Sequence, residues 1–276
     1  MNGKAPKDLS QVPFALLGFL LAYVVLVWFL DVPFPYLLFA LAGCVAYARR
    51  EQLREKRAMK LIAKGKRAEA AKIYDSQIRR GVKLPSAYLN RAHMLMQDDN
   101  LPAAMELLQK GLTMEPDPLI EEHIYMTMGM CYWMQGDHDN ALETFKGMTE
   151  RYEKTDGQVT ASLGYLYFIK EDYPTAKKWI KMALDEDKHV PIAWESMGQI
   201  HYRDGKHIKA EEAFKFAIAL QHNMVDSHYH LGLIAEAKND LERAREHFEN
   251  AGICDISKMN TVTAEQVKEK LDKFLE

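Results

Sequence analysis

The sequence predicts an all-α protein in which an N-terminal transmembrane hairpin of two helices precedes an α-solenoid of about six helix pairs and a C-terminal capping helix. Two observations lead to this prediction. Alanine recurs every 34 to 37 residues between positions 70 and 244, and long apolar runs precede the array. A fixed period of this length is typical of repeat proteins, in which each repeat is one supersecondary unit that buries its apolar face against its neighbours.

The predicted hairpin covers residues 12–48 and follows a cytoplasmic N-terminal tail, residues 1–11. Residues 12–30 carry no charge and would extend for about 28 Å as a helix, close to the thickness of a bilayer hydrocarbon core. Asp31 and the prolines after it end this run, and a second apolar run reaches Ala48. A cleavable secretory signal is the alternative for the first run, but no small-residue cleavage site follows Leu30.

A basic segment at residues 49–67 follows the hairpin and overlaps the first repeat. It holds nine Lys and Arg residues, whereas the tail holds two and the turn at 31–35 holds none. The positive-inside rule then places both ends of the hairpin in the cytoplasm, so we expect a two-span protein of a bacterial cell membrane with a cytoplasmic array. This orientation signal is sufficient to explain the charges, and contact with anionic lipid headgroups is a second role for some of them. The residues expected at the lipid surface are Arg49, Arg50, Arg54, Lys56 and Arg57.

Six repeat units cover residues 51–258 in one register. A small residue stands twelve positions before each recurring alanine, which lets the two helices of a unit cross closely. A large apolar or aromatic residue stands four positions after the alanine, on the same helix face. The alanines are Ala70, Ala104, Ala141, Ala176, Ala210 and Ala244; the small residues are Ala58, Ala92, Gly129, Gly164, Gly198 and Gly232; the large ones are Tyr74, Leu108, Phe145, Ile180, Phe214 and Phe248.

Turn and capping residues separate the two helices of each unit. Acidic or amide side chains just after the turn are expected to cap the second helix, and Pro102 and Pro174 fit a first helical turn. Thr263 and Gln266 form a possible capping box for the capping helix in residues 259–276. The predicted turn residues are Gly65, Asp99, Gly136, Glu171, Gly205 and Asn239, and the predicted caps are Asn100, Asp139, Asp172 and Asp240.

The pattern resembles the tetratricopeptide repeat family, whose repeats have 34 residues with Trp, Leu-Gly, Tyr, Ala, Phe, Ala and Pro at fixed offsets. The fifth unit matches best, through Trp194, Met197, Gly198, His201, Ala210, Phe214 and Ala217. The resemblance implies a right-handed α-solenoid of helix pairs. The first unit departs most from the pattern, because Arg54 and Arg57 stand at normally apolar positions and Gln77 stands where a small residue is expected.

The resemblance also implies that the first helix of each unit lines a concave face. The residues carried over to that face are apolar in units three and four and more polar in unit five, which fits a groove for an amphipathic helix or an extended peptide. Two alternatives stay open: these side chains fill the core, or the C-terminal helix folds back over them. The candidate partner-binding residues are Met126, Met130, Trp133, Met134, Tyr165, Phe168, Ile169, Gln199, Tyr202 and Arg203.

Composition and motifs argue against several other functions. Residues 68–276 hold 25 basic and 35 acidic residues, and this acidic balance argues against a nucleic-acid partner. The three cysteines lie far apart without a C-x-x-C motif, and His228 and His230 point in different directions on a helix, so no metal site is expected. No phosphate-binding or hydrolase motif occurs, so we expect neither an enzyme nor a cofactor.

The sequence therefore predicts a membrane-anchored scaffold or receptor that binds a protein or peptide partner in the concave groove of its array. The alternative is an accessory assembly subunit of a larger membrane complex, in which the hairpin makes the main contacts.

Overall fold

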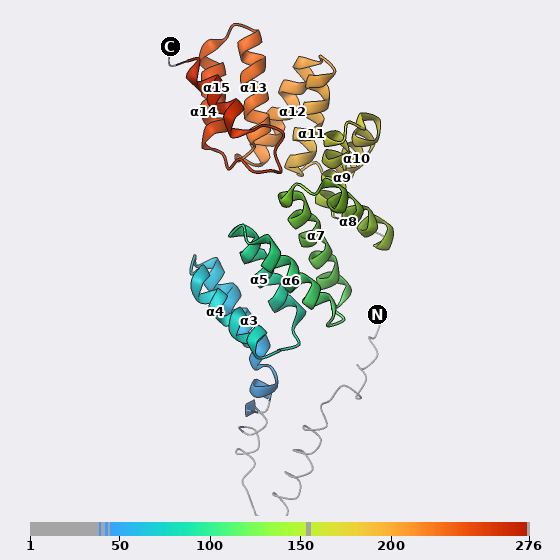
Figure 1. The fold of residues 1–276 in the computed structure, drawn as a ribbon, viewed down its shortest axis with the longest axis vertical. Coiled ribbons are helices and arrows are strands. Elements are labelled where there is room, and N and C mark those ends of the chain that lie inside the picture. Colours follow the sequence, from blue (N-terminus) through green and yellow to red (C-terminus); the bar gives the residue numbers. More distant parts are fainter. Residues whose placement is uncertain (1–38, 40–41, 44, 153–155, 275–276) are drawn as a thin grey trace, which may run out of the picture. The chain divides into compact units, whose positions relative to one another are not determined.

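The computed structural model describes residues 39, 42–43, 45–152 and 156–274 of the chain (Figure 1). The chain divides into two compact units, Met1–Val82 and Lys83–Glu276. The first helix pair of the array belongs to the first unit, and the later pairs belong to the second.

Helix pairs make up both units. In the described part of the first unit, α3 (Arg50–Ala63) packs on α4 (Arg67–Arg79). The second unit has five further pairs and a last helix, and consecutive pairs pack against each other. Its helices are α5 (Pro85–Gln97), α6 (Leu101–Leu112), α7 (Pro118–Gln135), α8 (His138–Arg151), α9 (Gly157–Ile169), α10 (Tyr173–Glu186), α11 (Pro191–Arg203), α12 (His207–Leu220), α13 (Val225–Ala237), α14 (Leu241–Ile253) and α15 (Ala264–Asp272).

The turns between paired helices lie where the register predicts them. The six residues expected there all have a positive φ, from 57° at Asp99 to 81° at Gly136. This left-handed conformation ends a helix and favours Gly, Asn and Asp. Asn100, Asp172 and Asp240 cap the following helices as expected. Asp139 does not, because Asp137 accepts the hydrogen bond from the backbone N–H of Asn140 at 3.2 Å.

The small residues of the register stand where paired helices cross. All six are buried, and in four units the recurring large side chain lies against a glycine. A Cβ added to Gly129, Gly198 or Gly232 would lie 2.6 Å from the ring of the paired phenylalanine. Gly164 lies equally close to the Ile180 side chain, at 2.5 Å. The predicted crossing is therefore confirmed, and in these units only glycine leaves room for the partner residue.

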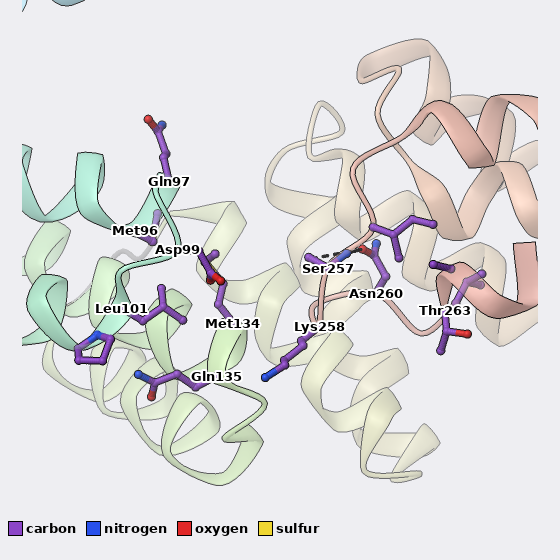
Figure 2. A pocket seen from close by; sticks show the side chains of 14 residues that line it. Met96, Gln97, Asp99, Leu101, Met134, Gln135, Ser257, Lys258, Asn260 and Thr263 are labelled. Carbon is purple, nitrogen blue, oxygen red and sulfur yellow. Dashed lines mark hydrogen bonds between the residues drawn. The ribbon is translucent and has the colours of Figure 1, made fainter. Parts of the chain in front are cut away.

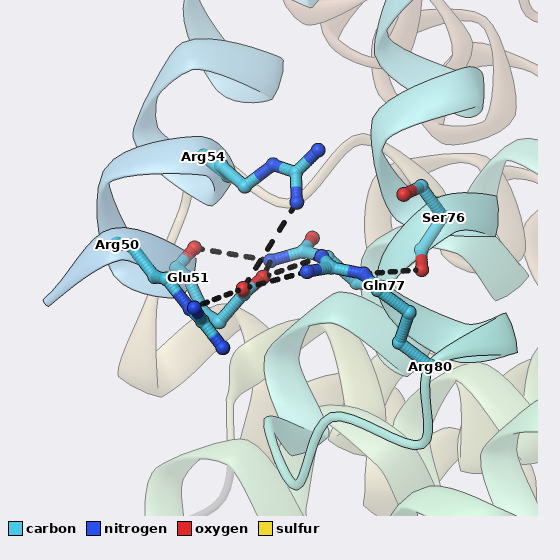
Figure 3. A network of polar contacts seen from close by, with 6 residues as sticks. All are labelled: Arg50, Glu51, Arg54, Ser76, Gln77 and Arg80. Carbon is cyan, nitrogen blue, oxygen red and sulfur yellow. Dashed lines mark hydrogen bonds and ion pairs between the residues drawn. The ribbon is translucent and has the colours of Figure 1, made fainter. Parts of the chain in front are cut away.

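A polar network joins α3 to α4 in the first unit (Figure 3). Glu51 accepts hydrogen bonds from both terminal nitrogens of Arg80, at 3.0 and 2.9 Å. Gln77, which is fully buried, donates to the Glu51 carbonyl at 3.0 Å. Partial burial alone would raise the pKa of Glu51, but hydrogen bonds from Arg80 and Gln77 and the charges of Arg80 and Arg54 outweigh it and lower that pKa. The network thus gives two of the residues outside the repeat pattern, Arg54 and Gln77, polar partners.

The predicted membrane hairpin and the two-span localisation are contradicted by this structure. In residues 39, 42–43, 45–152 and 156–274, no helix is both long and apolar enough to cross a membrane. The longest helix described, α7, has 18 residues and carries Glu121 and Glu122 in its first two turns. Residues 12–38 of the predicted hairpin lie outside the described residues. Lipid contact by the basic segment is unsupported, and Arg50 pairs with Glu51 at 3.2 Å instead.

Candidate functional site

The ten candidate binding residues lie on the first helices α7, α9 and α11. Five of them gather in or against one cluster, in which the rings of Trp133 and Tyr165 are 5.1 Å apart. These five residues, from α7 and α9, are Met126, Met130, Trp133, Tyr165 and Ile169. Phe168 packs against a neighbouring cluster, and the centre of its ring lies 6.5 Å from that of Tyr165.

Burial divides the candidate residues into two groups. Trp133 and Tyr165 are each 1 % exposed and Gln199 is 2 % exposed. Six others are half-buried, and Arg203 is exposed, with its guanidinium 3.5 Å from the centre of the Tyr173 ring. The aromatic centre of the proposed groove is therefore covered by other parts of the protein.

The cover includes the segment between α14 and α15, residues 254–263, which we call the strap. Met259 of the strap packs against the cluster that contains Trp133 and Tyr165. Thr261 accepts a hydrogen bond from the side-chain amide of Gln199 at 3.1 Å. The sequence left open that the C-terminal helix folds back over these residues. The observed cover comes from the same end of the chain, but it is the irregular strap and not the helix that follows it.

Asp226 at the start of α13 holds the strap in place. Its carboxylate accepts hydrogen bonds from the backbone N–H groups of Thr261 at 3.1 Å and Val262 at 2.8 Å. The Thr261 hydroxyl donates to it at 2.7 Å and the Asn260 amide at 3.3 Å. Tyr165 donates a further bond at 3.3 Å. A fully buried carboxylate that accepts this many bonds is well satisfied.

A second buried carboxyl group, Glu195 on α11, lies beside Asp226. It accepts hydrogen bonds from the backbone N–H and the hydroxyl of Ser227, at 2.9 and 2.8 Å. Burial and then the charge of Asp226 raise the pKa of Glu195 to about 8. Burial and the neighbouring carboxylate thus both favour the protonated form of Glu195.

The sequence reasoning did not identify Asp226 as a site residue. The signal was present, because Asp226 is the second residue of the sixth unit, a position that faces the concave side in the other units. The spacing rule was not extended to that unit. Its bonds to the strap join residues 35 and 36 apart in the sequence, and no periodic pattern reports such contacts.

An open cleft of about 820 Å³ lies beside the strap (Figure 2). The turn between α5 and α6 and the C-terminal end of α7 form one side, and the strap and the start of α15 form the other. Of the ten candidate residues, Met134 alone lines this cleft. The lining residues are Met96, Gln97, Asp99, Leu101, Pro102, Met134, Gln135, Ile256, Ser257, Lys258, Asn260, Val262, Thr263 and Ala264.

The cleft mixes apolar side chains with polar ones, and Asp99 and Lys258 add one charge of each sign. Met96, Leu101 and Met134 offer apolar surface, while Gln97 and Gln135 offer amide groups. Within the described ranges, no three His, Cys, Asp or Glu side chains are placed to hold a metal ion. This chemistry suits the recognition of a peptide or protein segment, and the fold and site together define a helical-repeat scaffold.

Comparisons with known proteins agree with this class. Models of the tetratricopeptide repeat match residues 195–254 and 125–155, so the chain contains tetratricopeptide repeats, and this fold is typical of protein–protein interaction. The chain is 26% identical over 181 residues to tetratricopeptide repeat protein 13 of Homo sapiens. That match covers 62% of this chain but only 20% of the relative.

Several solved structures share the fold. The APC/C hetero-tetramer Cut9-Hcn1 matches 87% of this chain with a TM-score of 0.67 and 16% identity, over 46% of its own chain. A tetratricopeptide repeat protein from Parabacteroides merdae matches 86% of this chain and 89% of its own, with a TM-score of 0.62 and 18% identity. PilW, a type IV pilus biogenesis factor, matches 83% of this chain and 99% of its own, with a TM-score of 0.60 and 16% identity. At these identities the likeness concerns the fold alone.

Proposed function

We propose that this protein is a scaffold that binds a segment of a protein partner in the open cleft beside the strap. The observation that supports the proposal is the cleft itself, about 820 Å³ with apolar side chains on both sides. Pockets of this size and composition bury short ligand segments, and amide groups in them fix the orientation of a bound chain.

The methionines give the cleft an adaptable surface. Met96 and Met134 lie on one side, and both are half-buried against the core of α5–α7. Ile256 of the strap, which is half-buried, lines the opposite side. Unbranched, polarisable methionine side chains follow the shape of different apolar ligands, so we expect the partner to insert one or two apolar residues between the two sides.

Site-specific crosslinking tests this function. A photoreactive amino acid at Gln135, an exposed residue of the cleft, should capture one partner segment in cells, identified by mass spectrometry. The same amino acid at Gln109, an exposed glutamine of α6 that does not line the cleft, serves as the matched control. Equal adducts from both positions, or none from Gln135, would contradict the proposal.

A methionine pair then measures the role of the cleft in binding the captured partner. Met134→Lys should weaken binding by about tenfold or more, or about 1.4 kcal/mol, because it places a charge at an apolar contact. Met182→Lys changes an exposed methionine of α10 outside the cleft and should leave the affinity unchanged. Circular dichroism confirms that both variants are folded, and equal affinities would exclude the cleft as the binding site.

A further inference from the structure

The strap binds its groove much as a separate peptide would. It carries no helix between Cys254 and Thr263. It packs against the Trp133–Tyr165 cluster through Met259, and it bonds α11 through Thr261 and α13 through Asn260, Thr261 and Val262. We propose that the strap is an internal occupant of a second peptide groove, formed by α9, α11 and α13, and that the external ligand of this groove is a peptide segment with the same bend and the same side-chain chemistry.

Main-chain hydrogen bonds do not require that the occupant belong to this chain. Asp226 accepts bonds from two consecutive backbone N–H groups, those of Thr261 and Val262. Consecutive backbone N–H groups point to opposite sides of an extended strand, and they converge on one acceptor only where the main chain bends, as it does at residues 260–262. Every segment that adopts this bend and lacks proline at these places offers the same pair of donors. The carboxylate is therefore an anchor for a bent main chain, and the specificity of the groove lies in the side chains around it.

Three side chains of the strap define the residues that the groove accepts. Met259 packs against the Trp133–Tyr165 cluster, so a long apolar residue fits there. Two positions later, the Thr261 hydroxyl donates to Asp226 and accepts from Gln199, a pair of bonds that selects Thr or Ser. Val262 is buried in a small apolar cluster, which selects a small apolar residue. Asn260, whose side-chain amide donates to Asp226 at 3.3 Å, adds a fourth preference, so the ligand pattern is a long apolar residue, Asn, Thr or Ser, and Val or a similar residue.

The strap leaves two buried polar groups of the concave face unsatisfied. Among the described residues, neither the indole N–H of Trp133 nor the side-chain carbonyl of Gln199 has a hydrogen-bond partner. Both side chains are almost fully buried. An occupant tethered at one end by α14 and at the other by α15 has little freedom to supply a carbonyl and an N–H there. A separate peptide lacks these two tethers, so it can satisfy groups that the strap leaves unpaired.

The open cleft gives such a ligand access to the groove. Ser257, Lys258 and Asn260 of the strap form part of the side of the cleft (Figure 2). A partner bound in the cleft therefore touches the edge of the strap before it reaches Asp226. The inference rests on the proposed function in this one respect, because it takes the ligand to be a segment of the partner that enters through the cleft.

A peptide copy of the strap provides the test. The probe is a fluorescent peptide with the sequence of residues 256–263, ISKMNTVT. In the strap-replaced protein, residues 256–262 of the full chain are exchanged for the same number of Gly and Ser residues. This protein should bind the peptide, and the wild-type chain should bind it at least about tenfold more weakly, because its groove is free in only a fraction of the molecules.

Matched substitutions in the peptide and in the protein distinguish binding in this groove from non-specific binding of peptides. The peptide with Thr261→Val keeps the shape of the side chain but loses the hydroxyl, and it should bind the strap-replaced protein at least about tenfold more weakly. Asp226→Asn in the strap-replaced protein should cause a similar loss, since it removes the charged acceptor of the two main-chain bonds. Unchanged affinity in either case would overturn the proposal.

The other outcomes of the peptide-binding experiment also test the proposal. Equal binding by wild-type and strap-replaced protein would show that the strap does not compete, and a folded strap-replaced protein that binds no peptide would overturn the inference. If the strap-replaced protein does not fold, hydrogen exchange of the wild-type chain is measured in its place. Excess peptide should displace the strap and accelerate exchange of the Thr261 and Val262 amides. Unchanged exchange rates would refute displacement of the strap. Wild-type dimers that exchange straps would assign the groove to a second copy and also refute it. Partner capture from Gln135 is measured separately, so failure here leaves the proposed function standing.

Discussion

Replacement of Gly198 by alanine tests the close helix crossing on which the repeat register depends. A Cβ at this position would lie 2.6 Å from Cδ1 and Cε1 of Phe214. Carbon atoms in contact are ordinarily separated by about 3.5–4.0 Å, so the ring or the helix must move by about 1 Å. The Phe214 side chain is 0 % exposed, which leaves it no solvent to move into. Gly198→Ala should therefore strain the crossing of α11 and α12.

The expected loss follows from two opposing effects. Overpacking of a well-packed core costs about 1–3 kcal/mol, whereas alanine in a helix interior is favoured over glycine by about 0.5–1 kcal/mol. We expect a net decrease of about 1–2 kcal/mol in the free energy of unfolding. Gly147→Ala is the matched control, because a Cβ there meets nothing within 4 Å on the exposed face of α8. It should stabilise the protein by about 0.5–1 kcal/mol.

Urea denaturation followed by far-ultraviolet circular dichroism measures both variants against the wild type. A double variant, Gly198→Ala with Phe214→Leu, gives the coupling between the two sites, and the smaller leucine should recover part of the loss. The reasoning is refuted if Gly198→Ala is as stable as the wild type, or if Gly147→Ala loses as much stability as Gly198→Ala does.

Three further predictions concern the second unit. The pKa of Glu195, raised to about 8 from 4.5 by burial and then by the nearby charge of Asp226, means that the folded state binds a proton that the unfolded state releases. The free energy of unfolding should therefore fall as pH rises between these values, and Glu195→Gln should remove that slope in urea melts across this range. Burial also raises the pKa of the Cys131 thiol to about 11, so iodoacetamide should label the half-buried Cys254 first in the folded protein, and equal labelling by mass spectrometry would contradict the burial of Cys131. Thr263→Ala removes the capping box of α15 and should lower the stability of that helix by about 1 kcal/mol. Faster amide hydrogen exchange in α15 would show this loss, and unchanged protection would count against the cap.

The periodic part of the fold was predictable because each repeat buries the same positions. The spacing between Gly198 and Phe214 recurs along the array, and the structure places such pairs in contact. Turn residues such as Asn239 were predictable for a local reason, since a helix that ends in the left-handed conformation favours a few residue types. The cap at Asp139 was wrong by two residues, because Asp137 is better placed to accept the N–H of Asn140.

The strap and its anchor were not predictable by the same reasoning. An irregular segment has no period, and the bond between Gln199 and Thr261 joins residues 62 apart. Nothing local in the sequence indicates that the strap covers Trp133. The candidate residues were placed on the right helices, but their exposure depends on that distant segment. The apolar N-terminal runs gave the opposite error, in which a local pattern predicted too much. Their composition alone suggested a membrane hairpin that the described helices do not support.

The strap also changes how the end of the array should come apart. Helical-repeat proteins lose their terminal repeats first, since each repeat touches only its neighbours. Here Met259 fastens the C-terminal end to the cluster formed by the third and fourth repeats, and Thr261 fastens it to Gln199 of the fifth repeat. Fraying from that end requires the fastening to open first, so the last three repeats should melt together as one cooperative block.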